Sequence, residues 1–111
     1  MAAHVTWVVV ADESRATVYA VPRGMARLRE VQELPPAPVG GDPAGELIRY
    51  LERARDEERY DELVLVAAPA FLEKLRTRLG DRARDSLVGA IQKNLVAAGR
   101  EVLQEEVLRV L

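Results

Sequence analysis

Cysteine is absent from this chain of 111 residues, and histidine occurs once, as His4. Without cysteine the protein has no disulfide, no thiolate nucleophile and no cysteine-ligated metal. A single histidine excludes a site built from several histidine ligands, and its place beside the N-terminus suits a serine–histidine triad poorly. The composition therefore predicts a protein of the reducing cytoplasm that holds neither a metal nor a cofactor.

Long apolar runs, a basic excess and nucleotide-binding motifs are also missing. Apolar runs such as residues 7–11 are far too short to cross a bilayer, and we expect no export signal. With 16 basic and 18 acidic residues the net charge is −2, so we expect no membrane or DNA partner and weak binding to phosphate backbones. The few aromatic residues do not suggest a stacking platform, and Trp7 and Phe71 are expected in the core.

The remaining composition is typical of one folded domain, which we expect to span residues 1–111. Apolar residues make up 49% of the chain and charged residues 31%, a balance that excludes general disorder. Only residues 35–45 look like a loop, because they include four prolines and three glycines. This stretch is too short to link two folded halves and is expected to be a surface loop.

Valine-rich runs alternate with stretches of helical periodicity. Residues 5–11 and 63–67 are apolar almost throughout, as in strands buried on both faces. Asp42 followed by Pro43 is typical of a helix start, a carboxylate cap followed by proline in the first turn. The patterns predict strands at residues 5–11, 16–21, 28–34, 63–67 and 87–93, and helices at residues 43–59, 69–80 and 100–111.

This order predicts an α/β fold with a mixed sheet: a three-stranded antiparallel meander followed by α-β-α-β-α, in a ribonuclease-H-like arrangement. The strand at residues 28–34 is charged and is expected at a sheet edge. Residues 81–86 are expected to form a polar turn.

The first helix is expected to bury Leu47, Ile48, Leu51 and Ala54. The last helix has an apolar face made of Leu103, Val107 and Leu111, widened by Val102, Leu108 and Val110. If that face is exposed, it is a candidate homodimer contact.

Polar residues gather where the predicted first strand ends. Asp12, Ser14 and Arg15 follow that strand directly, and Lys93 closes the predicted last strand. Ligands of open α/β sheets bind at such strand ends, so these four are candidate binding residues. Asp12 also reads as a turn residue that accepts backbone hydrogen bonds and pairs with Arg15.

A metal-dependent hydrolase is an alternative. Two-metal chemistry needs carboxylates that converge from several strand ends, and Asp12 with Glu13 or Glu46 supplies part of such a set. The next apolar strand, however, ends in residues 67–69, Ala-Ala-Pro, where a third carboxylate is needed. The incomplete set favours a protein that is not an enzyme.

Three segments resemble a known family. Residues 7–16, Trp-Val-Val-Val-Ala-Asp-Glu-Ser-Arg-Ala, resemble the opening of bacterial proteins described as required for attachment to host cells. Residues 63–76 and 91–95 resemble later segments of the same proteins. That family is similar in fold to the middle domain of archaeo-eukaryotic peptide-chain release factors and of the ribosome-rescue protein Pelota. The resemblance implies a mixed sheet, a cytoplasmic setting, and the ribosome or tRNA as a partner.

Release factors carry a Gly-Gly-Gln tripeptide in the loop before their long helix. This chain has Gly40, Gly41 and Asp42 there, in a loop shorter than that of its relatives. Because the glutamine coordinates the hydrolytic water, aspartate implies a module without peptidyl-tRNA hydrolase activity, and Gly40 and Gly41 become candidate contacts. Two adjacent glycines also suit an ordinary turn. The expected function is a non-catalytic, ribosome-associated module, with a homodimeric interaction protein as the alternative.

Overall fold

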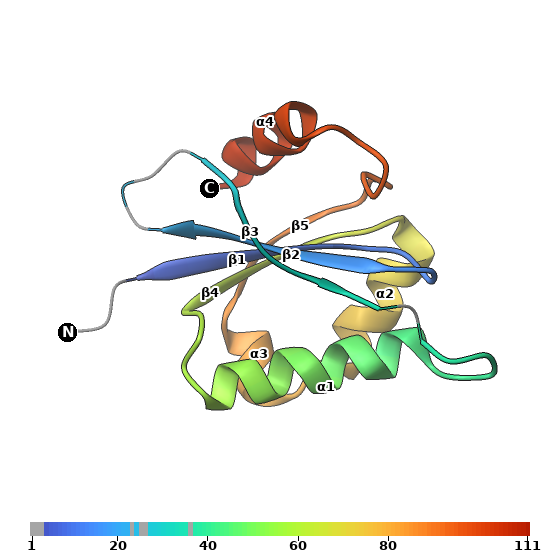
Figure 1. Cartoon of the computed structure of the whole chain (residues 1–111). Coiled ribbons are helices and arrows are strands. Elements are labelled where there is room, and N and C mark those ends of the chain that lie inside the picture. The colour runs from blue at the N-terminus through green and yellow to red at the C-terminus, as the bar shows by residue number, and fades with distance from the viewer. Residues whose placement is uncertain (1–3, 23, 25–26, 36) are drawn as a thin grey trace.

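A computed structural model describes residues 4–22, 24, 27–35 and 37–111 of the protein. Within them the chain forms five strands and four helices (Figure 1). In chain order these are β1 (Val5–Ala11), β2 (Ala16–Pro22), β3 (Arg29–Leu34), α1 (Pro43–Asp56), β4 (Glu62–Val66), α2 (Pro69–Arg78), α3 (Asp81–Asp85), β5 (Leu87–Ile91) and α4 (Arg100–Val110). None of the helices among these residues is long and apolar enough to cross a membrane.

The strands form one mixed sheet in the order β3-β2-β1-β4-β5. β1 pairs antiparallel with β2, and β2 pairs antiparallel with β3. β4 lies parallel to β1, and β5 lies parallel to β4. The predicted α/β fold, with its meander and its charged strand at an edge, is confirmed.

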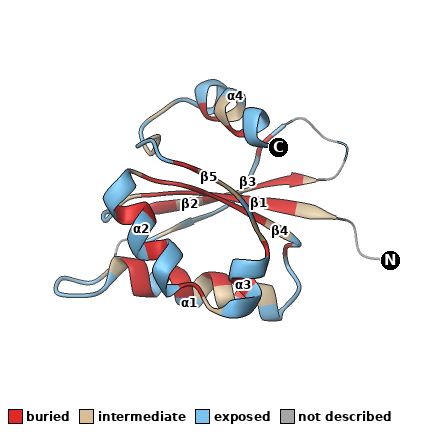
Figure 2. Ribbon diagram, turned by 180° about the vertical axis from the view of Figure 1, so that it is seen from behind, coloured by how far each residue is buried: buried red, intermediate tan, exposed pale blue. Residues whose placement is uncertain are grey.

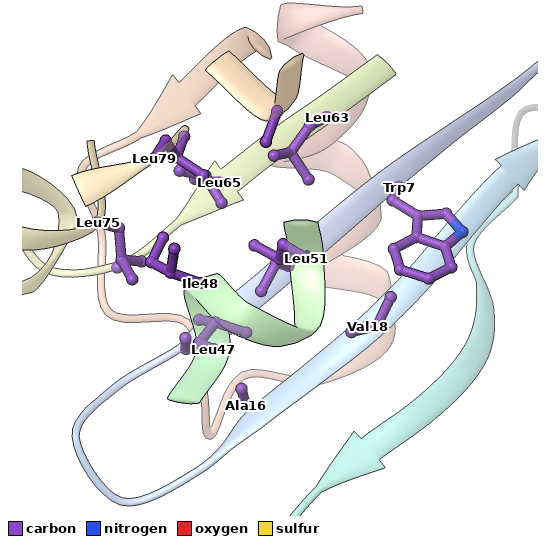
Figure 3. Close-up of a cluster of buried hydrophobic side chains, with 14 of the residues drawn as sticks. Trp7, Ala16, Val18, Leu47, Ile48, Leu51, Leu63, Leu65, Leu75 and Leu79 are labelled. Atoms are coloured by element: carbon purple, nitrogen blue, oxygen red, sulfur yellow. The ribbon is translucent and has the colours of Figure 1, made fainter. Parts of the chain in front are cut away.

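Helices cover both faces of the sheet, so the fold has three layers. α1, α2 and α3 lie on one face and α4 lies alone on the other (Figures 1 and 2). The first face carries a large buried cluster that includes Trp7, Leu51, Leu65 and Leu75 (Figure 3). The second face carries a smaller, aliphatic cluster closed by Leu103 and Val107 of α4. β1 and β4 contribute to both clusters, which explains why their sequences are apolar almost throughout.

The helix α1 begins and ends with local motifs. Asp42 is its N-cap and accepts a hydrogen bond from Gly45 N at 3.2 Å, as the sequence predicts. At the other end, Glu58 has a left-handed φ of 58°, and Arg59 N donates to Ala54 O at 2.9 Å. These contacts form a Schellman-type end, so α1 stops at Asp56 and the predicted extension to residue 59 is wrong.

Four other local predictions need correction. The second helix, α2, ends at Arg78 rather than at residue 80. Residues 81–85 form the short helix α3 rather than a turn, and its Ala83 is buried against the first cluster. β5 ends at Ile91, so Lys93 lies in the following loop and does not close a strand. The final helix ends at Val110, with Leu111 as its cap. The predicted turn after β2 includes Arg23, which lies outside the described residues.

Both edge strands contain an irregularity in their pairing. On β3 the register shifts opposite Val18 and Tyr19, which leaves Val31 as the extra residue. On β5 the register shifts opposite Leu63 and Val64, which leaves Val88 as the extra residue. Both valines are exposed. β-Bulges of this kind bend an edge strand and disturb its pairing with other chains.

Candidate functional site

The β1–β2 turn is organised by Asp12. Its Oδ1 accepts hydrogen bonds from Ser14 N at 2.7 Å and from Arg15 N at 2.9 Å, while Asp12 N donates to Arg15 O at 3.0 Å. Arg15 reaches the loop between β5 and α4, where its Nη2 lies 3.4 Å from Val96 O. The predicted turn role of Asp12 is therefore present. Among the described residues its carboxylate forms no ion pair with Arg15.

A cavity of about 360 Å³ lies beside this turn. The turn forms one wall, the proline-rich loop and the start of α1 form others, and Phe71 of α2 completes it. The lining residues are Asp12, Glu13, Ser14, Arg15, Ala16, Leu34, Pro35, Ala37, Pro38, Pro43, Glu46, Leu47, Tyr50 and Phe71. Tertiary structure thus brings the predicted residues Asp12, Ser14 and Arg15 together with the loop that follows β3.

The cavity also includes residues that the sequence did not single out. Tyr50 is the clearest of these. It is partly buried, lies one helical turn from Leu47 on α1 and packs against the first cluster. Its hydroxyl donates to Gln32 Oε1 of β3 at 2.9 Å, and its ring stacks on Trp7 with 6.0 Å between centroids. The sequence signal for this role is the position of Tyr50, three residues after Leu47 and four before Ala54, on the buried face of α1.

Two of the three acidic residues of the cavity form surface ion pairs. Glu13 pairs with Lys74 at 3.1 Å and Glu46 pairs with Arg49 at 2.8 Å. Across the described parts of the chain, no three histidine or acidic side chains are grouped so that they could hold a metal ion. The carboxylate set that Asp12 would need for two-metal chemistry is therefore not assembled among these residues.

The proline–glycine loop has a structural reason for each glycine. Gly41 N donates to Pro38 O at 2.7 Å, which closes a turn whose third residue, Gly40, has a left-handed φ of 79°. That conformation favours glycine in a type II turn. A Cβ on Gly41 would lie 2.8 Å from Pro38 O, which is too close. Neither glycine lines the cavity, and Val39 at the tip of the turn is fully exposed.

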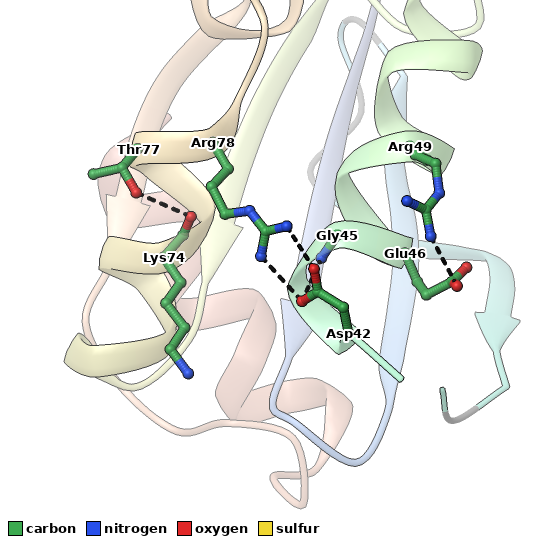
Figure 4. Close-up of polar contacts among 7 residues, drawn as sticks. All are labelled: Asp42, Gly45, Glu46, Arg49, Lys74, Thr77 and Arg78. Atoms are coloured by element: carbon green, nitrogen blue, oxygen red, sulfur yellow. Dashed lines mark hydrogen bonds and ion pairs between the residues drawn. The ribbon is translucent and has the colours of Figure 1, made fainter. Parts of the chain in front are cut away.

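Asp42 has one partner, Arg78, besides its role as the cap of α1. Arg78 of α2 donates to both carboxylate oxygens, one of them at 3.0 Å (Figure 4). The Arg78 guanidinium, together with the amide of Gly45, lowers the pKa of Asp42 to about 2. The carboxylate of Asp42 is thus fixed between α1 and α2.

Lys93 lies apart from the other candidate residues. Its Nζ pairs with Glu106 of α4 at 2.8 Å, and this contact lowers the pKa of Glu106. Lys93 does not line the cavity. The predicted set therefore divides into three cavity residues, two turn glycines beside the cavity, and one lysine on the α4 side of the sheet.

Comparisons with known proteins give a family and a fold. The model of a family described as "Protein required for attachment to host cells" matches residues 42–107, from the start of α1 into α4. No curated protein matches the chain. A solved structure named "Archaeal protein" is similar over 95% of this chain, with a TM-score of 0.55 and 13% sequence identity. The present chain covers 36% of that protein, and at this identity the likeness concerns the fold alone.

Proposed function

The chain belongs to the family described as "Protein required for attachment to host cells", and from this premise we propose that it is a non-catalytic binding module that associates with the ribosome. The observation that carries the proposal is the cavity beside the β1–β2 turn. Concave, mostly apolar sites at the ends of strands are where α/β sheets bind their partners.

Binding rather than catalysis is favoured by how the polar groups are used. Asp12 holds the turn, Asp42 caps α1, and Arg15 joins the turn to the β5–α4 loop. Each of these contacts stabilises the fold, and none pairs a nucleophile with a base. The cavity is therefore better suited to hold a partner than to transform one.

The ribosome is proposed because of the resemblance to the release-factor middle domain. The loop that contains Gly40 and Gly41 corresponds to the release-factor loop that carries Gly-Gly-Gln, and here it borders the cavity through Ala37 and Pro38. The proposed contact surface therefore combines the β1–β2 turn with this loop. Lys93 is left out of it, because it does not line the cavity.

Sedimentation of the protein through a gradient, from cell lysate at low and at raised salt, tests the proposal. We expect the protein to migrate with ribosomal particles at low salt and to be released at raised salt, because exposed charge contacts are screened. Ala37→Trp fills the cavity and should abolish co-migration. Val39→Trp adds the same side chain to the same loop, outside the cavity, and should not. Protein that stays at the top of a low-salt gradient contradicts the proposal.

A second candidate function, homodimerisation, is favoured by the difference between the two sheet edges. β3 carries Arg29, Glu30 and Glu33 along its edge, whereas β5 has no charged residue. Charged residues protect an edge strand from pairing with another chain, and β5 lacks that protection. Close to β5, α4 adds exposed apolar side chains such as Leu108.

Light scattering across a range of protein concentrations tests this second function. A dimer through β5 predicts that Val88→Lys yields monomer, while the matched change Val31→Lys on β3 leaves the mass unchanged. A dimer through the helix predicts instead that Leu108→Glu yields monomer. A monomeric mass for the unmodified protein at every concentration excludes both contacts.

A further inference from the structure

The cavity beside the β1–β2 turn combines apolar walls with an acidic rim. Phe71 and Tyr50 are among the apolar and aromatic side chains that line it. The lining contains three carboxylates, those of Asp12, Glu13 and Glu46, and one guanidinium, that of Arg15, so its formal charge is −2 (three negative groups and one positive). An apolar hollow with a negative rim is complementary to an apolar ligand that carries positive charge.

Two of the three carboxylates, those of Glu13 and Glu46, are open to such a ligand. The side chains of Glu13 and Glu46 are 67% and 54% exposed, and their partners Lys74 and Arg49 are equally open to solvent. Ion pairs of this kind are weak and exchange readily for a better partner. The Arg15 guanidinium is directed to the carbonyl of Val96, away from pairing with these acids.

We infer that the cavity receives a basic, apolar peptide segment of a protein partner. Its volume of about 360 Å³ suits one or two side chains rather than a folded element. The aliphatic part of an arginine or lysine would pack on Tyr50 and Phe71, with the charged end at the carboxylates. This inference rests on the proposed function, because it names the occupant of the same site. At the ribosome, that occupant is a basic protein segment and not RNA, whose phosphates the carboxylates repel.

The test uses an acetylated and amidated octapeptide of alternating leucine and arginine as the probe. The isotope-labelled full chain is titrated with this peptide, with the matching leucine–glutamate peptide, and with oligouridylate, while backbone amide shifts are recorded. We expect the arginine peptide to shift amides of residues 12–16 and 46–50. The glutamate peptide and the RNA should leave them unchanged. Shifts of these amides by RNA and not by the arginine peptide overturn the inference in favour of a nucleic-acid partner.

Charge variants test whether the carboxylates of the cavity bind the arginine peptide. Asp12→Asn keeps the oxygen that accepts the two turn amides, and Glu46→Gln keeps the shape of α1. The double variant should bind the arginine peptide about tenfold more weakly, as expected for two partly solvated charge contacts. Glu101→Gln with Glu105→Gln removes the same charge from exposed positions on α4 and should change the affinity less than about twofold. Equal affinity in the two double variants overturns the inference.

The peptide titration and the ribosome gradient fail independently. Cavity binding of the arginine peptide without co-migration supports the occupant named here and contradicts the ribosomal setting. Co-migration that is lost in Ala37→Trp, combined with no peptide binding, supports the ribosomal setting and overturns the basic-peptide occupant.

Discussion

The two faces of the sheet are closed in different ways. On one face, three helices pack on a cluster that includes the aromatic side chains Trp7, Tyr60 and Phe71. On the other face, α4 alone packs on a cluster whose buried residues are valines, leucines and one isoleucine. On α4 only Leu103 and Val107 are buried, and several of its apolar side chains are exposed. The face with three helices is thus interlocked by several elements, whereas the face under α4 depends on one helix near the chain end.

The first face also holds its aromatic side chains in fixed contacts. Trp7 stacks on Tyr60 with 5.0 Å between ring centroids, and the Tyr60 hydroxyl donates to Leu51 O at 2.9 Å. Burial raises the pKa of Tyr60 to about 12. We therefore expect the packing of this face to contribute more to the stability of the fold than the packing under α4. Substitutions on the two faces test this expectation.

Leu51→Ala should have the largest effect. Leu51 is fully buried at 0% exposure between α1 and the sheet, where several elements restrict relaxation. We expect a loss of about 3–5 kcal/mol in the free energy of unfolding, from lost burial and from the cavity that remains. Urea unfolding followed by circular dichroism measures the loss.

Leu103→Ala is the matched change on the other face. Leu103 is 2% exposed, so the chemistry removed is the same, but α4 can shift toward the sheet as a unit. We expect the free energy of unfolding to fall by about 2–3 kcal/mol, at the lower end of the range for leucine truncation. A loss equal to that of Leu51→Ala would show that the two faces are equally rigid and would break the comparison.

Asp42→Asn tests the link between α1 and α2, which adds to the first face. Asparagine remains a good N-cap, so the change isolates the charge contact with Arg78. The folded pKa of Asp42, about 2, lies below its ordinary value of 3.8. The stabilisation is therefore fully present above about pH 4 and is lost as the pH falls through about 2. Urea midpoints of both proteins should differ at pH 7 and converge near pH 2.

Other carboxyl groups do not affect this comparison of urea midpoints between wild type and Asp42→Asn. Glu62, beside His4, and Glu106, beside Lys93, also have lowered pKa values, and both titrate in either protein. Their contribution cancels in the difference between wild type and variant. A difference that persists unchanged at pH 2 would mean that the Asp42 charge has no part in it.

Leu108→Glu should have the smallest effect on stability. Its side chain is 41% exposed on α4, so we expect the free energy of unfolding to change by less than about 0.5 kcal/mol. A loss above about 2 kcal/mol would show that the Leu108 side chain is buried in solution, and that α4 is packed more completely than its exposed apolar residues indicate. The same variant reports on dimerisation, because its mass and its stability are measured separately.

Local sequence predicted most of the fold, and it placed Asp12, Ser14 and Arg15 together without the other residues that line the cavity. The strands around Val9 and Leu65, the cap at Asp42 and the buried face of α1 were all readable, because each depends on periodicity or on a short motif. The helix α3 was missed because five residues are too few to show a helical period. The end of α1 was misplaced because Glu58, and not a glycine, takes the left-handed conformation.

By itself the sequence determined the five strands, the three longer helices, the buried face of α1 and the turn that Asp12 organises. Only the tertiary structure decided that Asp12 and Arg15 share a cavity with Tyr50, and that Lys93 does not belong to it. The physical reason is the range of the interactions. Caps, turns and periodic burial act within a few residues, whereas a cavity depends on how a hairpin turn, a loop and two helices pack together.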